Sequence, residues 1–428
     1  MEEIEIQENL PETEKRRGQN KGFWKGFFCA VLLFAVITAI SMGINAYFES
    51  RVVVSGGEEL ITDDQRVQSK LRMIESCIRG YYLEEIDDKQ LEDYLYYGLV
   101  AGMGDPYAAY YNEEETRSML DSDSGNYCGI GAMFSQNLVT GVITVSKVYE
   151  GCPAYEAGML PGDILYMVEG EEVTGMDLTS VVTKIKGEEG TKVTISMIRG
   201  TEVLDLAMKR QIIEVPTIEH KMLENQIGYI LITEFDGVTS SQFETALKEL
   251  QQDGMEKLII DLRNNGGGSV DAVSKIADLL LPEGLVVSTV YNDGSTVERT
   301  SDASRVNVPM AVLINGATAS ASEILAGALQ DYKAAVIVGS QSYGKGIVQS
   351  TLDLRDGTAL KLTTAKYYTP NGNNIHGIGI TPDVEFDLPE ELKTEVTLSM
   401  EEDVQLQKAI EVLQQLHLFF MDCVIQNI

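Results

Sequence analysis

The stretch that decides the fold runs from residue 311 to 349 and reads AVLINGATASASEILAGALQDYKAAVIVGSQSYGKGIVQ. It opens with an apolar run typical of a buried strand, turns at Asn315-Gly316, and enters an alanine-rich helix candidate at Ser320. A second apolar run follows at 335–338, and Gly339 starts a glycine-rich loop. Strand, helix and strand in this order predict an α/β layer architecture.

The same alternation extends outward from this stretch and predicts a core domain at 211–390. A chain of 428 residues is too long for one compact core, so two or three domains are expected. The predicted core strands and helices are Ile227–Ile232, Ser240–Gln251, Lys257–Leu262, Val308–Ile314, Ser320–Leu329 and Val336–Val338.

Ser320 stands at the predicted start of a helix, where a serine has two interpretations. Ser320-x-x-Glu323 matches a capping box, in which the hydroxyl accepts from an otherwise unpaired backbone N–H. Alternatively, a strand-to-helix turn exposes the hydroxyl as a nucleophile. The N–H of Ala321 would then donate to the oxyanion that forms after attack on a carbonyl. The turn 261–268, DLRNNGGG, ends in three glycines that permit close backbone approach and is a source for a second donor.

A nucleophilic serine needs a base, and the candidate is Lys345 between two glycines. None of the three histidines falls in a motif, so a Ser-His-Asp triad has little support. A lysine accepts a proton only when its pKa falls well below ~10.4, through burial and the lack of a carboxylate partner. Gln349, four residues later, could orient the lysine amine by hydrogen bonding.

Two other motifs overlap this lysine. Residues 339–345 match GxxxxGK, but Gly346 replaces the Ser or Thr that a phosphate-binding loop needs for Mg²⁺. Ser342-x-x-Lys345 matches SxxK, but the adjacent glycines argue against the helix that this motif opens. The sequence therefore favours Ser320 with Lys345.

A compact segment at 128–210 precedes the core, and its motif order resembles a bacterial PDZ domain. The order is a Gly-Ile-Gly loop at 129–131, an apolar stretch at 132–134, a strand at 142–145, AGMLPGDIL at 157–165, a helix candidate at 177–186 and a strand at 192–199. The resemblance implies that Gly129, Ile130 and Gly131 bind a terminal carboxylate, with the peptide added to the adjacent strand. Part of the apolar helix face, Val181 included, is expected to line the groove, and the rest is core.

The N-terminal sequence predicts a membrane anchor. Residues 26–48 form an uncharged apolar run of sufficient length for a ~30 Å hydrocarbon core. Five basic residues precede the run, which predicts a cytoplasmic segment at 1–25 and a catalytic domain outside the membrane. A cleaved signal peptide is the alternative, although no clear small-x-small cleavage site follows. Residues 52–64 read as a linker, and 65–120 and 391–428 as helical segments.

Composition excludes several function classes. The formal net charge of -33 disfavours nucleic acid as a partner, because such a surface repels phosphate. The three histidines and five cysteines form no metal-binding pattern, so neither metal nor other cofactor is expected. A Cys128–Cys152 disulfide is left open, since spacing alone does not support it.

Taken together, these motifs resemble the C-terminal processing peptidases, the tail-specific Ser–Lys proteases of the S41 family. The likeness runs from about residue 65 to 415. Besides the PDZ segment, it includes GDPYAAYY (104–111), DLRNNGGG (261–268), NGATASASEILAGALQD (315–331), GSQSYGKGIVQ (339–349) and GITPDV (379–384). The family's catalytic serine, lysine and glutamine fall on Ser320, Lys345 and Gln349. Its oxyanion donors fall on Ala321 and a glycine of the 261–268 turn, assigned to Gly267.

The resemblance implies a crotonase-like α/β core with an inserted PDZ domain that blocks the active site until a tail or partner binds. We therefore expect a membrane-anchored serine endopeptidase that cleaves extracytoplasmic proteins with apolar C-terminal tails. The helical ends suggest a homodimer. The alternative is a catalytically silent scaffold that only binds tails through its PDZ domain.

Overall fold

The computed structural model describes residues 60–137, 140–392, 398–399 and 401–425. The chain divides into two compact units, Met1–Asp87 and Asp88–Ile428. The described part of the first unit holds η1 (Ile61–Asp63) and α2 (Gln65–Tyr81), in which no residue is buried. Within the described ranges, no helix has the length and apolarity to cross a membrane. The predicted anchor at 26–48 lies outside them.

A six-stranded sheet forms the centre of the second unit. Its order is β10-β11-β12-β15-β16-β19, and only β10 runs antiparallel to its neighbour. The strands are β10 (Ile218–Leu223), β11 (Ile227–Ile232), β12 (Lys257–Asp261), β15 (Met310–Ile314), β16 (Ala335–Gly339) and β19 (Val384–Glu385). A short η2 (Glu224–Gln226) joins β10 to β11. The α/β expectation for this region is confirmed.

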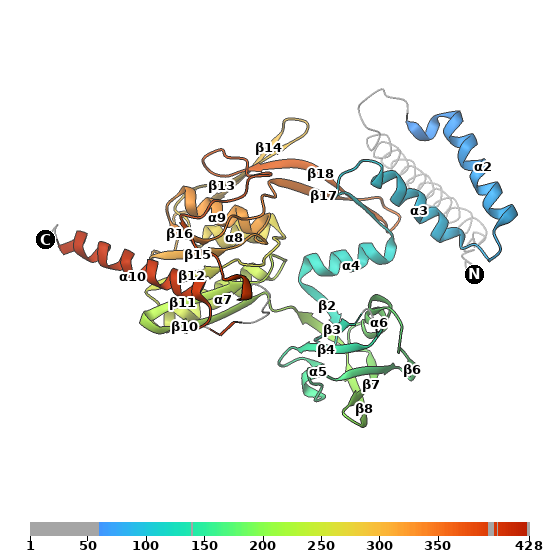
Figure 1. Cartoon of the computed structure of the whole chain (residues 1–428), viewed down its shortest axis with the longest axis horizontal. Helices are drawn as coiled ribbons and strands as arrows, with labels where there is room; N and C mark the ends of the chain where they lie inside the picture. Colours follow the sequence, from blue (N-terminus) through green and yellow to red (C-terminus); the bar gives the residue numbers. More distant parts are fainter. Residues whose placement is uncertain (1–59, 138–139, 393–397, 400, 426–428) are drawn as a thin grey trace, which may run out of the picture. The chain divides into compact units, whose positions relative to one another are not determined.

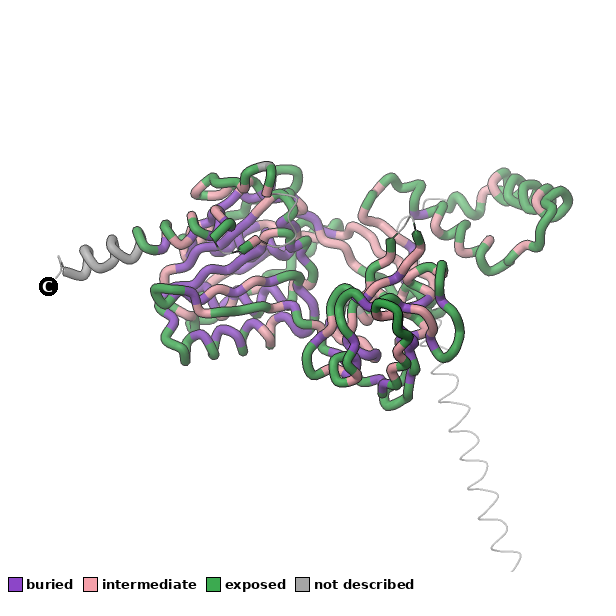
Figure 2. Tube along the Cα trace, turned by 60° about the horizontal axis from the view of Figure 1, so that its bottom comes forward, coloured by how far each residue is buried: buried purple, intermediate pink, exposed green. Residues whose placement is uncertain are grey.

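Alternating side chains of the central strands enter two separate apolar clusters. Ile260, Val312 and Ile337 pack with helices on one face, whereas their neighbours Ile259, Leu313 and Val338 pack against the C-terminal helix on the other. Because both faces are covered, β12 and β15 read as continuous apolar runs and every residue in them is buried. Figure 2 shows this concentration of buried residues along the parallel strands.

Three helices cover the first face and one covers the second (Figure 1). They are α7 (Thr239–Gln252), α8 (Val270–Asp278) and α9 (Ala321–Asp331) on one side, and α10 (Val404–Ile425) on the other. The short η3 (Glu390–Leu392) precedes α10. The carboxyl ends of the parallel strands β12, β15 and β16 and the start of α9 lie at the candidate site. Ligands of open α/β sheets bind at this edge, outside the carboxyl ends of the strands.

A second sheet supplies the other wall of that site. It consists of β1 (Ala109–Tyr111), β18 (Ala359–Tyr368), β13 (Gly284–Tyr291) and β14 (Thr296–Ser301), with β17 (Ile347–Asp353) also paired to β18. The expectation that 65–120 is helical is wrong at Ala109–Tyr111, which pairs with β18 instead. Helices α3 (Asp88–Ala101) and α4 (Glu113–Ser124) flank this strand.

The segment between α4 and the core folds around its own apolar cluster. A sheet in the order β3-β4-β5-β7-β8 packs against α6, and β6 pairs with β5. The elements are β3 (Ala132–Gln136), β4 (Ile143–Val148), α5 (Pro153–Glu156), β5 (Ile164–Val168), β6 (Glu171–Glu172), α6 (Leu178–Ile185), β7 (Lys192–Arg199) and β8 (Glu202–Lys209). A ribbon of β2 (Asn126–Gly129) and β9 (Gln211–Glu214) closes the base of this segment.

Candidate active site

Ser320 lies in a strained turn between β15 and α9. It is the N-cap of α9, with φ 57° and ψ -117°, a backbone conformation that a side chain rarely adopts. The predicted capping box is present, and the Ser320 N–H donates to Glu323 Oε2 at 2.9 Å. Ser320 therefore begins the helix and, although half-buried, also lines a cavity. Strain of this kind persists only where the surrounding structure enforces it, and it is common at active sites.

The glycine turn after β12 approaches this serine closely. A Cβ added to Gly267 would lie 2.7 Å from both Ala319 O and Ser320 Cβ. The Gly267 N–H, however, donates to Asn265 Oδ1 at 2.8 Å. The Ala321 N–H has no intrahelical acceptor, because it belongs to the first residue of α9, and among the described residues no hydrogen bond takes it. Ala321 therefore presents a donor toward the nucleophile, whereas Gly267 as an oxyanion donor stays a prediction.

A buried carboxylate joins the serine turn to the lysine loop. Glu323 is fully buried, and its two oxygens accept four hydrogen bonds. They come from Ser320 N at 2.9 Å, Ser342 Oγ at 2.5 Å, Gly344 N at 2.7 Å and Lys345 N at 2.8 Å. Because α9 and the loop after β16 share this acceptor, the backbones of Ser320 and Lys345 are held in fixed register.

Lys345 is half-buried, and no carboxylate among the residues that the structure describes pairs with its amine. Burial lowers its pKa, the charge of Lys361 lowers it further, and Asp105 opposes both with a smaller effect. The amine lies over the ring of Tyr107, 4.6 Å from the ring centroid. The structure shows no hydrogen bond between the Lys345 amine and the Ser320 hydroxyl, both of which belong to described residues. Catalytic hydrogen bonds often form only when substrate binds, so this geometry does not remove Lys345 as a base.

Ser320, Lys345 and Gln349 line one cavity of about 340 Å³. Gln349 Nε2 donates to Thr363 Oγ1 at 3.2 Å, so the amide is held by β18 rather than by the lysine. Tyr367, also on β18, donates its hydroxyl to the carbonyls of Ser320 (3.0 Å) and Lys345. Burial, together with Glu323, raises the pKa of Tyr367 well above its ordinary value, so this donor keeps its proton. The cavity thus brings together the three residues that the sequence placed in the catalytic set.

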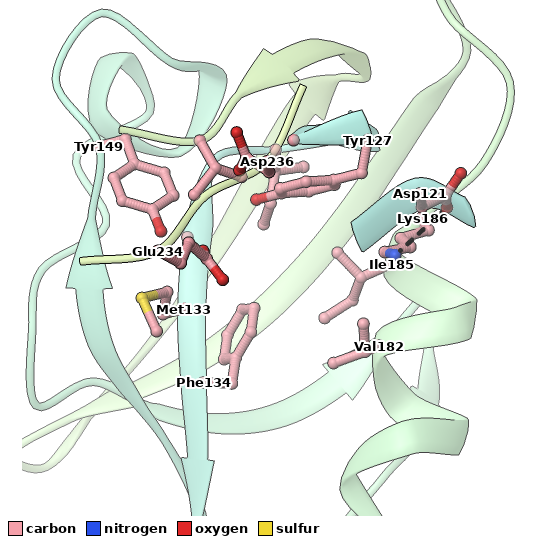
Figure 3. A pocket seen from close by; sticks show the side chains of 14 residues that line it. Asp121, Tyr127, Met133, Phe134, Tyr149, Val182, Ile185, Lys186, Glu234 and Asp236 are labelled. Atoms are coloured by element: carbon pink, nitrogen blue, oxygen red, sulfur yellow. Dashed lines mark hydrogen bonds and ion pairs between the residues drawn. The ribbon is translucent and has the colours of Figure 1, made fainter. Parts of the chain in front are cut away.

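An apolar groove of about 320 Å³ lies between β3 and α6, bordered by residues that follow β9 and β11. Figure 3 shows Phe134 of β3 and Val182 of α6 on opposite sides of it. Ile130 of the Gly-Ile-Gly loop lines the groove, and Gly131 has φ 78°, which favours glycine. Tyr127 lies at one end, where burial raises the pKa of its phenol.

The assignment of Val181 to this groove is wrong. Its side chain is fully buried in the apolar cluster beneath the sheet, and Val182 and Ile185 line the groove instead. Successive helical residues point about 100° apart, so the sequence pattern identifies an apolar helix without fixing how it is rotated against β3.

Comparison with known proteins identifies the family of this chain. The family model "Peptidase family S41" matches residues 226–386, and a PDZ domain model matches 144–199. A probable CtpA-like serine protease of Staphylococcus aureus (strain COL) is 33% identical over 391 residues, covering 90% of this chain and 77% of that protein. The chain belongs to peptidase family S41.

Further S41 relatives agree with this. The corresponding protein of Staphylococcus saprophyticus is 30% identical over 391 residues, covering 90% of this chain and 78% of the relative. Among solved structures, the photosystem II D1 C-terminal processing protease is 29% identical and covers 78% of this chain and 90% of its own, with a TM-score of 0.44. The S41 and PDZ family models, together with the 33% identical CtpA-like serine protease, show that this chain is a serine-type peptidase with a PDZ domain.

The S41 site also contains groups that the sequence did not reveal. Lys361 and Tyr367 lie on a strand with no recognisable motif, Tyr107 lies in the GDPYAAYY motif without an assigned role, and Glu323 was interpreted only as a helix cap. The disulfide left open between Cys128 and Cys152 is not formed, and both thiols are free. Hydrogen bonds identify Tyr367 and Glu323 as part of the site, the Lys345 amine over its ring identifies Tyr107, and the cavity lining identifies Lys361.

Proposed function

We propose that this S41 peptidase hydrolyses peptide bonds through an acyl-enzyme on Ser320, with Lys345 as its base. The Ser320 Oγ–H bond breaks as Oγ attacks the scissile carbonyl, and the proton passes to the lone pair of Lys345 Nζ. Collapse of the tetrahedral adduct breaks the scissile C–N bond, and the resulting ammonium returns the proton to the leaving amine. A water molecule, deprotonated by Lys345, then attacks the ester on Ser320, and the serine oxygen leaves and takes back that proton. Gln349 orients the amine, and the N–H groups of Ala321 and Gly267 stabilise the oxyanion. No cofactor takes part.

The observation that carries this proposal is a strained serine and a carboxylate-free lysine in one cavity. A lysine paired with a carboxylate would remain protonated and could not accept the serine proton. Productive geometry requires the Lys345 amine to leave the face of Tyr107 and the Gly267 N–H to leave Asn265. Substrate binding in the cavity would supply both changes.

The substrates we propose are proteins with apolar C-terminal tails. The groove between β3 and α6 is lined mainly by apolar residues, with charged side chains also on its wall (Asp121, Lys186, Glu234 and Asp236), and the Gly129–Gly131 segment precedes its receiving strand. An extended tail would add to β3 through main-chain hydrogen bonds, with its carboxylate at the loop. A tail held there would delay release of the substrate while the core cleaves it.

We further propose that residues 26–48 anchor the chain in a membrane, with the catalytic domain on the extracytoplasmic side. The uncharged run and its basic flank support this placement. We also propose that the α/β core is crotonase-like. Exposed apolar side chains on α2, among them Leu71, Met73 and Ile74, support pairing with a second copy of this chain.

The test is cleavage by the full chain in detergent micelles. An unstructured reporter with an apolar tail is incubated with wild type, Ser320→Ala and Lys345→Ala, and the products are read by mass spectrometry. Fragments from wild type alone are the expected result. Full activity of Lys345→Ala would contradict the Ser–Lys mechanism. A reporter with an amidated tail should bind more weakly and be cleaved more slowly, because it lacks the terminal carboxylate that the Gly129–Gly131 loop is proposed to bind.

The alternative of a catalytically silent scaffold makes the opposite prediction. Reporter peptides would bind with tail dependence, yet wild type and Ser320→Ala would both leave them intact. The serine, lysine and glutamine around one cavity favour the enzyme.

A further inference from the structure

Strand β18 contributes three residues to the candidate active site. Lys361 and Tyr367 line its cavity, and Thr363 lies opposite the cavity residue Gln349 of β17. Tyr367 donates to the carbonyls of Ser320 and Lys345, and Thr363 accepts from Gln349. Two of these three residues therefore already hold parts of the catalytic set, which leaves the role of Lys361 to be explained.

Lys361 lines the same cavity as Ser320 and Lys345. Its ammonium makes no hydrogen bond or ion pair with any residue that the structure describes. The carboxylates around the two lysines are Asp105, before β1, and Asp123, at the end of α4 and on the cavity wall. Asp105 accepts from the Tyr107 N–H at 2.9 Å and is held by Thr363. The cavity thus contains two lysines and no carboxylate hydrogen-bonded to either amine.

Two ammonium groups in one poorly solvated cavity repel each other, and the more easily neutralised one loses its proton. A neighbouring cation is an established way to give a lysine a free lone pair at neutral pH. The direction of the charge effects at Lys345 agrees, because the positive charge of Lys361 lowers its pKa and Asp105 opposes this with a smaller effect. Tyr107 and Tyr343, whose hydroxyls are 3.5 Å apart, are the other titratable groups on this side.

We propose that Lys361 is a positioning residue whose positive charge favours an unprotonated Lys345 amine that is ready to accept the Ser320 proton. This inference rests on the proposed Ser–Lys mechanism. Lys361 exchanges no proton during the reaction: the proton moves from Ser320 Oγ to Lys345 Nζ and then to the leaving amine. The ammonium of Lys361 acts only through its charge.

The charge model differs from a substrate-binding role for the same side chain. If Lys361 bound an acidic group of the substrate, its loss would raise KM for acidic substrates and leave the pH dependence unchanged. If it acts on Lys345, its loss moves the pH at which kcat/KM rises, because that limb reports the free enzyme's base. A neutral apolar-tailed reporter separates the two effects.

The experiment measures kcat/KM against pH for the full chain in detergent. The variants are Lys361→Met and Lys361→Gln, which remove the charge, Lys361→Arg, which keeps it, and Lys366→Met as control. Lys366 lies on the same strand, is exposed and lies outside the cavity. Circular dichroism and thermal unfolding establish that each variant is folded, and two neutral variants guard against one failing to fold.

We expect the acidic limb of Lys361→Met and Lys361→Gln to move to higher pH by about one unit, with near wild-type kcat/KM recovered above it. Below the limb, kcat/KM should fall about tenfold relative to wild type. Lys361→Arg and Lys366→Met should superimpose on wild type. The sign follows because a base without a cationic neighbour holds its proton to higher pH.

Three outcomes overturn the proposal: an unmoved limb in both neutral variants, an arginine variant that behaves like methionine, or a change confined to KM. The proposed function fails separately, if Lys345→Ala remains active or Ser320→Ala still cleaves. A wild type that depends on Lys345 but shows no shift in the neutral Lys361 variants would therefore remove only the role of Lys361.

Discussion

At the scale of single residues, the site depends on a few positions that allow little substitution. Ser320 is strained, Gly267 leaves no room for a Cβ beside it, and Glu323 accepts hydrogen bonds from the backbone N–H groups of Ser320 and Lys345. In each case a small change in one side chain displaces atoms that react or donate.

Gly267→Ala should lower kcat about 100-fold with little effect on KM, because the new Cβ would lie 2.7 Å from Ser320 Cβ and Ala319 O. Gly267 has φ 103°, which adds backbone strain to the steric conflict. Steady-state kinetics on the apolar-tailed reporter measures the effect. The control is Gly316→Ala on the same loop as Ser320, where the nearest atom to a new Cβ is 3.9 Å away. Equal activity of both variants would contradict the assigned close approach.

Glu323→Gln should destabilise the core by about 3–5 kcal/mol, because an amide cannot accept from all four donors and presents its own N–H groups to some of them. Urea unfolding followed by fluorescence measures the loss. The control is Glu249→Gln, an exposed glutamate whose partner is His220 at 2.9 Å, which should change stability by less than about 1 kcal/mol. A similar midpoint for the two variants would refute a structural role for the buried carboxylate.

At the scale of elements, β18 and the ends of β12, β15 and β16 form the two walls of the catalytic cavity. The turn after β12 is also tied to α10. Arg263 donates to both oxygens of Asp403, at 2.9 and 2.7 Å, and to Asp261. Burial alone would lower the pKa of Arg263, but its two carboxylate partners raise it, so the guanidinium stays charged. The C-terminal helix thereby supports the glycine turn from outside the cavity.

Tyr367→Phe tests the role of β18. Removal of the Tyr367 hydroxyl leaves the carbonyls of Ser320 and Lys345 without this donor. We therefore expect the free energy of unfolding to fall by about 1–3 kcal/mol and kcat to decrease. Because the pKa of Tyr367 lies well above its ordinary value, the deficit in kcat should be the same across the pH range in which Lys345 titrates. The matched control is Tyr368→Phe, whose hydroxyl makes no hydrogen bond to a described residue. A pH-dependent deficit would indicate that the hydroxyl itself titrates.

At the scale of the whole molecule, the groove proposed for tail binding and the cavity proposed for cleavage lie in different domains. The groove belongs to the PDZ segment and the cavity to the S41 core. A change confined to the groove should therefore affect substrates through binding and leave the chemistry of the cavity intact.

Val182→Glu should weaken binding of an apolar-tailed peptide more than about tenfold, because a buried unpaired carboxylate opposes the apolar tail. Fluorescence anisotropy gives the Kd, and cleavage of the amidated reporter should be unchanged. Val203→Glu on β8, a residue that is 57% exposed, is the control and should bind normally. Unaltered binding by Val182→Glu would mean that tails bind elsewhere.

The sequence by itself determined the order of strands and helices in the core, because the apolar runs of β11, β12 and β15 and the helix start at Ser320 are local patterns. It also brought Ser320, Lys345 and Gln349 forward as a set, since each stands in a distinctive glycine-rich context. The anchor at 26–48 and the oxyanion role of Gly267 remain predictions.

Only the tertiary structure decided which distant residues complete the site. Tyr367 and Lys361 lie on an ordinary strand, and their roles depend on β18 passing beside the serine turn. Glu323 satisfies a local capping rule, yet three of its four hydrogen-bond donors lie in the loop after β16, which packs against α9. These donors are the Ser342 hydroxyl and the backbone N–H groups of Gly344 and Lys345. The rotation of α6 that buries Val181 and exposes Val182 to the groove was likewise set by packing. Periodicity defines a helix face, whereas contact with other elements defines what that face meets.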